Sequence, residues 1–401
     1  MRFFYYHGNK FDICIIFGML IKINVMLQLN TSRLGALPDR YLRQCINEGI
    51  IFNGRDDQIN PSSIDLTVDL NTLQEVPYVF TPSKKRSMIH ETLETLGAKK
   101  VPKTNDGYLL EPNVVYVAEI CEEFKSRAGL FARANPKSST GRSDIHVRLM
   151  GDLIPQYDRI PENWSGKLYA LFKTNSFRIL IDQDTVCLNQ LRIFRNGLGI
   201  LTTEELQTLA EERLILRNDH KHKDLMFTDM IRENSIALSV DLRDWGNDGY
   251  LGYIAKKDVG RPLIWKKGAN DPDDFFEPIP KIMDNRTYTV EEMRFLILSS
   301  RESVYVPREY ACEMISFDDT RGEIRAHYAG FIDNDWGSEG GPRPLTLEVR
   351  AYEPTMIYHG QPIASIVLHK MYAPVEKGYD DMLTSNYTKQ NRALLGKFFK
   401  Q

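Results

Sequence analysis

Two short segments, far apart in the chain, carry side chains suited to nucleotide chemistry. The first, Pro136–Arg142, reads Pro-Lys-Ser-Ser-Thr-Gly-Arg. Its hydroxyls at Ser138 and Ser139 can donate hydrogen bonds to phosphate oxygens, Gly141 lets the backbone approach closely, and Arg142 can bind two oxygens at once. The glycine and lysine spacing of a Walker loop is absent. The segment indicates either a phosphate-binding turn or a solvated turn with a positively charged end.

The second segment is an apolar run interrupted by one carboxylate. In Leu345–Val349 the residues Leu345, Leu347 and Val349 share one face of a strand, and Thr346 and Glu348 share the other. Glu348 is either a carboxylate on the solvated face of an edge strand or a general base whose pKa is raised by apolar surroundings.

Two further polar segments flank this run. Asp333 lies before it, in Phe331–Trp336, where two nearby acids could hold a sugar hydroxyl, a metal ion or nothing. The C-terminal segment Gly378–Asn391 is polar and aromatic, with few aliphatic residues. It is either a frayed tail or a flap whose Tyr379 and Gln390 close over a ligand.

The composition narrows the class of protein. A chain of 401 residues predicts about two domains. Its 51 basic and 54 acidic residues give a net charge of −3, which offers no overall attraction to nucleic acid or to an anionic membrane. Five cysteines without a Cys-x-x-Cys pair indicate reduced thiols in a cytoplasmic protein. The zinc-deaminase pattern of His-x-Glu with Pro-Cys-x-x-Cys is missing, so we expect no zinc.

The first residues, 1–34, are expected to be an extension without function. Phe11–Leu29 is apolar but interrupted by Lys22, and it lacks a clear cleavage site for a signal peptide. A spanning helix would place Lys22 near its centre. We expect a non-native extension, with translation starting at Met19 or Met26.

The remaining pattern predicts a mainly β protein with a few helices. A short helix opens at Leu37–Asp39 and stops at Gly49, and a second runs from Thr202 to about Leu216 behind a capping box formed with Glu205. Strands are predicted at Ile64–Leu70, Val114–Ile120, Lys167–Phe172 and Phe177–Ile181.

The second half of the sequence repeats elements of the first in the same order, which predicts a duplicated domain. The matched segments are Ser63–Leu66 with Ser239–Leu242, Tyr116–Ala118 with Leu296–Leu298, and Asn163–Gly166 with Asp335–Gly337. We expect a first domain at 35–200, a helical connector at 201–234 and a second domain at 235–401.

Taken together, these segments resemble the dCTP deaminase branch of the dUTPase-like superfamily, in a long form with two tandem domains. Asn386 stands where that family has a lysine. The resemblance rests on Pro61–Leu66 as the first signature, Lys137–Arg142 as the Arg-Ser-Ser-x-x-Arg phosphate motif with lysine in place of the first arginine, Ile332–Trp336 as the nucleoside-contacting Ile-Asp-Pro-Gly-Trp segment, Leu347–Val349 as the strand of the catalytic glutamate, and Tyr379 and Gln390 as the ligand-closing residues of the tail.

This resemblance implies two tandem dUTPase-like domains of β-barrel or jelly-roll type, and hydrolytic deamination of dCTP to dUTP and ammonia. It also implies Mg²⁺ carried by the triphosphate, and a homo-oligomer with a threefold or pseudo-threefold arrangement of domains. Glu348 would be the catalytic base. The substrate would be bound by Lys137, Ser138, Ser139, Arg142, Asp333, Thr346, Leu347, Tyr379 and Gln390.

Departures from the family pattern divide the site between the two halves. In the first half Leu171 stands in place of the glutamate and Pro161 in place of the aspartate. In the second half the phosphate motif reads Ser-Phe-Asp-Asp-Thr-Arg over Ser316–Arg321, where the acids would repel a triphosphate. We therefore expect a composite site with the phosphate turn of the first half and the base of the second.

Two other functions remain open from the sequence. One is cleavage of dUTP to release pyrophosphate, alone or together with deamination. The other is a non-catalytic nucleotide-binding regulatory protein that lost its sites after duplication.

Overall fold

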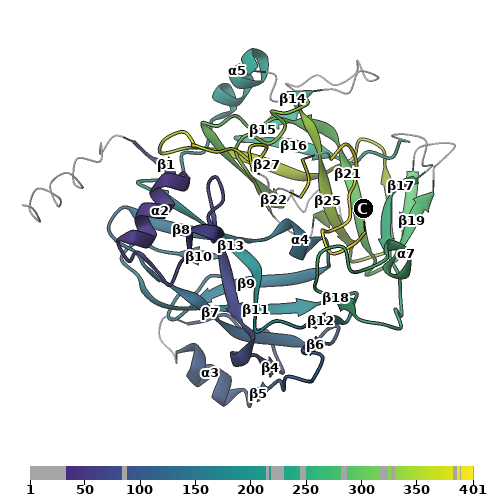
Figure 1. Ribbon diagram of the computed structural model, residues 1–401. Coiled ribbons are helices and arrows are strands. Elements are labelled where there is room, and N and C mark those ends of the chain that lie inside the picture. Colours follow the sequence, from purple (N-terminus) through teal and green to yellow (C-terminus); the bar gives the residue numbers. More distant parts are fainter. Residues whose placement is uncertain are drawn as a thin grey trace, which may run out of the picture.

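The computed structural model describes residues 33–83, 88–213, 216–217, 230–243, 250–280, 287–316, 324–326, 330–382, 386–388 and 390–400. The fold is mainly β, as the sequence predicts, with curled sheets in each half and short helices around them (Figure 1). The N-terminal extension and the acidic turn expected at Ser316–Arg321 lie almost entirely outside the described residues.

The main sheet of the first half is antiparallel and bends round on itself. Its strands run in the order β10 (Arg159–Ile160), β8 (Leu130–Pro136), β13 (Thr185–Arg195), β3 (Ile64–Asp69), β7 (Val115–Lys125), β11 (Ser165–Thr174) and β9 (Ile145–Gly151). The short strands β1 (Gly35–Ala36), β2 (Ile51–Phe52), β4 (Gln74–Val76) and β5 (Lys99–Lys100) extend it at the sides.

The second half repeats this order in two sheets. One runs β24 (Phe331–Ile332), β22 (Tyr310–Ser316), β27 (Pro362–Lys370), β16 (Ser235–Ser239) and β15 (Ile231–Arg232). The other runs β19 (Phe276–Pro280), β17 (Tyr250–Ala255), β21 (Phe295–Val304), β25 (Arg343–Ala351) and β23 (Ile324–Ala326), with β14 (Leu216–Arg217) beside β21. Strands β20 (Thr287–Val290) and β26 (Thr355–Tyr358) form a separate pair.

The register between equivalent strands corrects one of the expected matches. Ile64 of β3 pairs with Leu191 of β13, and Ile236 of β16 pairs with Ile366 at the corresponding position of β27. Ile64 and Ile236 therefore occupy equivalent positions in the two halves. Ser63–Leu66 therefore matches 235–238 and not Ser239–Leu242, four residues further on. The match of Tyr116–Ala118 with Leu296–Leu298 is confirmed. Val117 of β7 pairs with Leu171 of β11, and Ile297 of β21 pairs with Glu348 at the corresponding position of β25.

A third sheet joins the two halves. Strand β12 (Ile179–Ile181) pairs with β6 (Tyr108–Leu110) on one side and in parallel with β18 (Leu263–Ile264) of the second half on the other. Phe275 and Phe276 of the second half pack in the hydrophobic core of the first, as do Phe398 and Phe399 near the C-terminus. The C-terminal segment, which in the structure continues beyond Asn391 to residue 400, is therefore anchored in the first-half core after passing the second half.

The helices are short and lie at the edges of the sheets (Figure 1). Helix α2 (Asp39–Asn47) ends close to the predicted stop, and α5 (Thr203–Arg213) begins behind the predicted capping box, in which Glu205 accepts from the Thr202 N–H at 3.0 Å. The other helical segments are α3 (Ile89–Thr95), α4 (Ser138–Gly141), α7 (Pro272–Phe275), η1 (Asp56–Gln58) and η2 (Leu70–Thr72).

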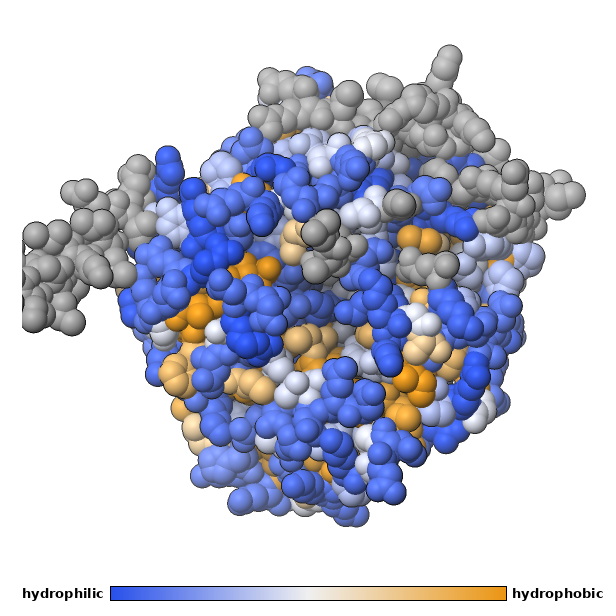
Figure 2. Space-filling model, in the orientation of Figure 1, coloured by the Kyte–Doolittle hydropathy of each residue, from blue (hydrophilic) through white to orange (hydrophobic). Residues whose placement is uncertain are grey.

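Apolar residues are gathered inside the molecule. Leu206 and Leu209 of α5 pack in the core of the second half, so this part of the expected connector belongs to that core. The face in Figure 2 is mostly hydrophilic, with hydrophobic residues in small scattered groups. Among the helices that the structure describes, none combines the length and the apolar character needed to cross a membrane.

An ion pair and two hydrogen bonds, all buried, fix the two halves against each other. Arg350, on β25, donates to the Asp144 carboxylate that follows α4, and both side chains are almost fully buried. Arg192, on β13, is completely buried and donates to the Cys312 carbonyl of β22 at 2.8 Å. Asn135 Nδ2 donates to Glu313 Oε1 at 3.0 Å across the same interface. These contacts hold α4 and β25 in a defined relation.

Candidate active site

A cavity of about 310 Å³ lies where α4 of the first half meets β25 of the second. Its walls also include the loop after β24 and the C-terminal segment. Nine of the ten predicted site residues line it: Lys137, Ser138, Ser139, Arg142, Asp333, Thr346, Glu348, Tyr379 and Gln390. The tenth, Leu347, points to the opposite face of β25 and is buried in the second hydrophobic core.

Glu348 and Arg142 face each other across the boundary between the halves. Arg142 Nε lies 3.5 Å from Glu348 Oε1, and both side chains are more than nine-tenths buried. Burial raises the pKa of Glu348 to about 7, while the Arg142 guanidinium opposes this rise. A carboxyl group in this state is divided between its acid and its base form near neutral pH, which is the condition for transferring protons in both directions.

The phosphate motif forms a short helix, α4, and not the simple turn expected from the sequence. Ser139 is buried and Ser138 is half-buried, and both face the cavity. Lys137, just before α4, donates to the Asp65 carboxylate, which also accepts from Asn60 Nδ2 at 2.9 Å. Asp65 thus fixes the direction of Lys137. The residue of the second half that corresponds to Asp65 is Ala237, whose side chain is uncharged.

Two side-chain oxygen atoms of the cavity-lining residues have no hydrogen-bond partner among the described residues. These are Asp333 Oδ1 and Thr346 Oγ1, and both are buried. Burial raises the pKa of Asp333 to about 6, with Arg192 and Lys137 opposing the rise. Buried polar atoms are nearly always hydrogen-bonded, so unpaired ones in a cavity wall indicate groups reserved for a ligand or for water.

The C-terminal segment folds over Arg142. Gln390 Oε1 and the Leu394 carbonyl each accept a hydrogen bond from the guanidinium at 3.0 Å, and the Tyr387 ring lies 3.8 Å from the guanidinium carbon. Gln390 in turn donates to the Pro344 carbonyl of β25 at 2.7 Å. The segment therefore forms part of the cavity and is not a frayed tail.

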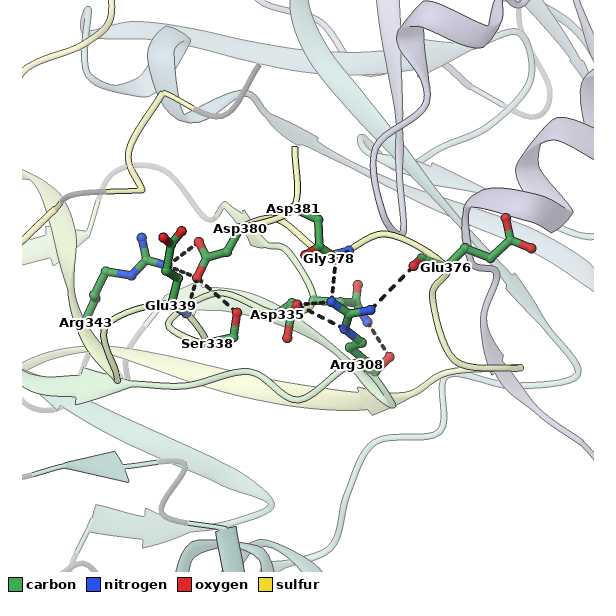
Figure 3. Close-up of polar contacts among 10 residues, drawn as sticks. Arg308, Asp335, Ser338, Glu339, Arg343, Glu376, Gly378, Asp380 and Asp381 are labelled. Carbon is green, nitrogen blue, oxygen red and sulfur yellow. Dashed lines mark hydrogen bonds and ion pairs between the residues drawn. The ribbon is translucent and has the colours of Figure 1, made fainter. Parts of the chain in front are cut away.

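Two arginines of the second half fasten the start of this segment, as Figure 3 shows. Arg343, on β25, donates to the Asp380 carboxylate, which also accepts from the Glu339 N–H at 2.9 Å. Arg308 donates to Asp335 at 2.6 Å and to Asp381 at 2.5 Å. The segment is thus tied to the loop that carries Asp333. This attachment also positions Tyr379, whose backbone N–H donates to the Asn334 carbonyl at 2.8 Å.

The position in the first half that corresponds to Glu348 is apolar. Leu171 pairs with Val117 at the position where Glu348 pairs with Ile297. It is buried in an apolar cluster that includes Ile89 and Leu93 of α3. Pro161 likewise follows β10 as Asp333 follows β24.

Several residues of the cavity were not assigned from the sequence. Asp65 lay within a recognised signature and Tyr387 within the polar tail, but their contacts with Lys137 and Arg142 join segments too distant to be paired by pattern. Lys397 also lines the cavity, and no local signal marks it. In the part of the chain that the structure describes, no three His, Cys, Asp or Glu side chains gather as a metal site would require.

Comparisons with known proteins agree with this architecture. The family model for the N-terminal domain of 2′-deoxycytidine 5′-triphosphate deaminase matches residues 33–198, and the model for its C-terminal domain matches residues 203–399. The crystal structure of 2′-deoxycytidine 5′-triphosphate deaminase from Agrobacterium tumefaciens is similar, with 31% identity and a TM-score of 0.76 over 86% of this chain and 100% of that chain. No curated protein matches the chain. The protein belongs to the 2′-deoxycytidine 5′-triphosphate deaminase family.

Proposed function

We propose that this protein deaminates dCTP by hydrolysis, forming dUTP and ammonia. Family membership supports both the substrate and the reaction. The observation that carries most weight is Glu348, which is buried beside Arg142 in a cavity between the halves and has a pKa raised to about 7. No other glutamate lines this cavity among the described residues.

In the proposed reaction Glu348 acts first as a base and then as an acid. Its carboxylate takes a proton from water, and the water oxygen bonds to C4 of the cytosine ring. The C4–N bond then breaks, and the proton held by Glu348 leaves with the amine as ammonia. The proton of the added hydroxyl passes to ring N3, which leaves the C4 carbonyl of dUTP. General acid–base catalysis of this kind contributes about 10² to 10⁴ in rate, so positioning must supply the rest.

The polar groups of the cavity suggest how the substrate is oriented. Lys137, Ser138 and Ser139 would bind the phosphates, with Mg²⁺ held by the phosphate oxygens of the substrate. Asp333 and Thr346 would pair with the nucleoside, since each has a buried oxygen without a partner among the described residues. This orientation would bring the cytosine ring to Glu348. A homo-oligomer and a cytoplasmic location stay predictions.

The proposal is tested by measuring ammonia release from Mg·dCTP with the wild type and with Glu348→Gln. Glutamine keeps the size of the side chain but has no basic oxygen, so we expect ammonia release to fall at least about 100-fold. Binding of dCTP should stay within about threefold of wild type, because the phosphate contacts are unchanged. Glu353→Gln, an exposed change just beyond β25, is the control and should be fully active.

Assaying pyrophosphate alongside ammonia separates the alternatives. Pyrophosphate released from dUTP would mean that the site also cleaves, or only cleaves, the triphosphate. Saturable dCTP binding without either product would identify a non-catalytic nucleotide-binding protein. Wild-type ammonia release by Glu348→Gln would remove the assignment of the base.

A further inference from the structure

Lys397 lies at the end of the C-terminal segment and faces the same cavity as Lys137 and Ser138. It lies outside the segments that suggested the site from the sequence. Its side chain is half-buried, and among the described residues it has no ion-pair partner. A half-buried lysine without a carboxylate partner beside a nucleotide cavity calls for an explanation, because desolvating an ammonium group is costly.

The backbone around Lys397 is held firmly on both sides. Its N–H donates to the Tyr387 hydroxyl at 3.2 Å, and its carbonyl accepts from the Gly268 N–H at 3.0 Å. The next residue, Phe398, packs in the first-half core with its ring 3.9 Å from that of Trp265. Lys397 is therefore not part of a loose terminus.

The residue before it packs directly on the phosphate motif. A Cβ placed at Gly396 would lie 3.4 Å from Arg142 Cβ and 3.6 Å from the Ser139 carbonyl oxygen. This contact brings the C-terminal segment against α4, so that Lys397 enters the cavity at its phosphate-motif end.

The charged groups that act on Lys397 leave its ammonium group without a carboxylate of its own. Burial lowers the pKa of Lys397, the charge of Lys137 lowers it further, and Asp65 opposes both. Asp65 is already paired with Lys137. Lys397 thus has cations, Lys137 and Lys267, among the charges that act on it, and the one carboxylate among them is paired elsewhere. This setting suits a polyanion.

We propose that Lys397 is a substrate-binding residue that contacts the triphosphate of the nucleotide, opposite Lys137. The inference rests on the proposed function, which supplies the triphosphate. Through Lys397 the tail that covers Arg142 also binds the phosphates directly. Nucleotides with fewer phosphates would accordingly bind less tightly.

The test compares Lys397→Gln and Lys397→Arg with Lys400→Gln. Lys400, three residues on, is exposed and paired with Asp271, so it is a matched control outside the cavity. We expect the KM for Mg·dCTP to rise about tenfold or more in Lys397→Gln, with kcat changed less than about twofold. Lys397→Arg should recover most of the loss, and Lys400→Gln should match wild type.

A binding measurement keeps the inference separate from the reaction. Titration calorimetry in the Glu348→Gln background compares dCTP with deoxycytidine. Lys397→Gln should weaken dCTP binding about tenfold and leave deoxycytidine binding unchanged. This result would support the inference even if wild type released no ammonia. Equal losses for both ligands, or no loss for dCTP, would overturn it.

Discussion

Two opposing influences act on the protonation of Glu348, and their balance decides at which pH it can serve as a base. Its burial favours the protonated acid, whereas the nearby Arg142 guanidinium favours the carboxylate. Arg142 is itself held by Gln390 and by the Tyr387 ring of the C-terminal segment. The protonation of the proposed base therefore depends on a residue from the other half of the chain and on the tail above it.

This balance predicts a pH profile. Because only ionised Glu348 can accept a proton from water, kcat/KM for dCTP, which reports the free enzyme, should fall as the pH drops through about 7. In Arg142→Gln the opposing cation is lost, so the acid limb should move to higher pH, in addition to any loss of binding. The measurement is kcat/KM from about pH 5.5 to about pH 9 for both proteins. An acid limb at the same pH in both would show that Arg142 does not set the ionisation of Glu348.

At the scale of strands, a buried carboxylate ties equivalent pairs of strands in each half. Glu122 of β7 accepts from the Thr67 N–H of β3 at 2.8 Å, and Glu302 of β21 accepts from the Ser239 N–H of β16 at 2.8 Å. Glu302 also accepts from the Ser239 hydroxyl at 2.5 Å. Burial raises its pKa to about 7.

This raised pKa predicts how stability changes with pH. Folding favours protonated Glu302, so its contribution is full below about pH 4.5 and is lost as the pH rises through about 7. In Glu302→Gln part of the fall in unfolding free energy across that window should disappear. Urea unfolding at several pH values measures this, with exposed Glu292→Gln as the control. A fall as steep in Glu302→Gln as in wild type would contradict the prediction.

Individual strands could be predicted from the sequence more reliably than the register between them. Alternation located β3, and the content of β-branched and aromatic residues located β11, each to within two residues at each end. The match of Ser63 with Ser239 was wrong because Ser-Val-Asp-Leu resembles the first signature better than Ser-Ile-Ala-Leu does. The pairing of Ile236 with Ile366 decides the true register, and this contact lies 130 residues away in the chain.

Prediction of the site residues shows the same difference between local pattern and distant contact. The phosphate motif and Glu348 could be named from local sequence and from the family resemblance. The placement of Asp65 and Tyr387 could not, because each acts through a partner in a distant segment. Lys397 could not either, because it reaches the cavity through the packing of Gly396 on the distant α4. Leu347 marks the opposite case, since its place in the motif suggested contact with substrate while strand alternation turned its side chain into the core.

At the scale of the whole molecule, the site depends on how the halves are joined. Asp144 follows Arg142 by two residues, and Arg350 follows Glu348 by two residues. Their buried ion pair therefore fixes both sides of the cavity relative to each other. Arg133 and Glu313 form a second ion pair across the same interface, at 3.5 Å, and neither side chain lines the cavity. The two pairs offer a matched comparison between joining the halves and positioning the site.

We expect Asp144→Asn to lower the unfolding free energy by about 3 kcal/mol, because Arg350 is left as an uncompensated buried charge. Among the molecules that remain folded, kcat should fall about tenfold or more, since small displacements of reacting groups are costly. Arg133→Gln should lower stability while kcat per folded molecule stays within about twofold. Adding Arg350→Met to Asp144→Asn should recover stability, because the pair is then replaced and not broken. If kcat recovers in parallel, the pair only stabilises the fold; if kcat stays low, the pair positions Glu348 against Arg142.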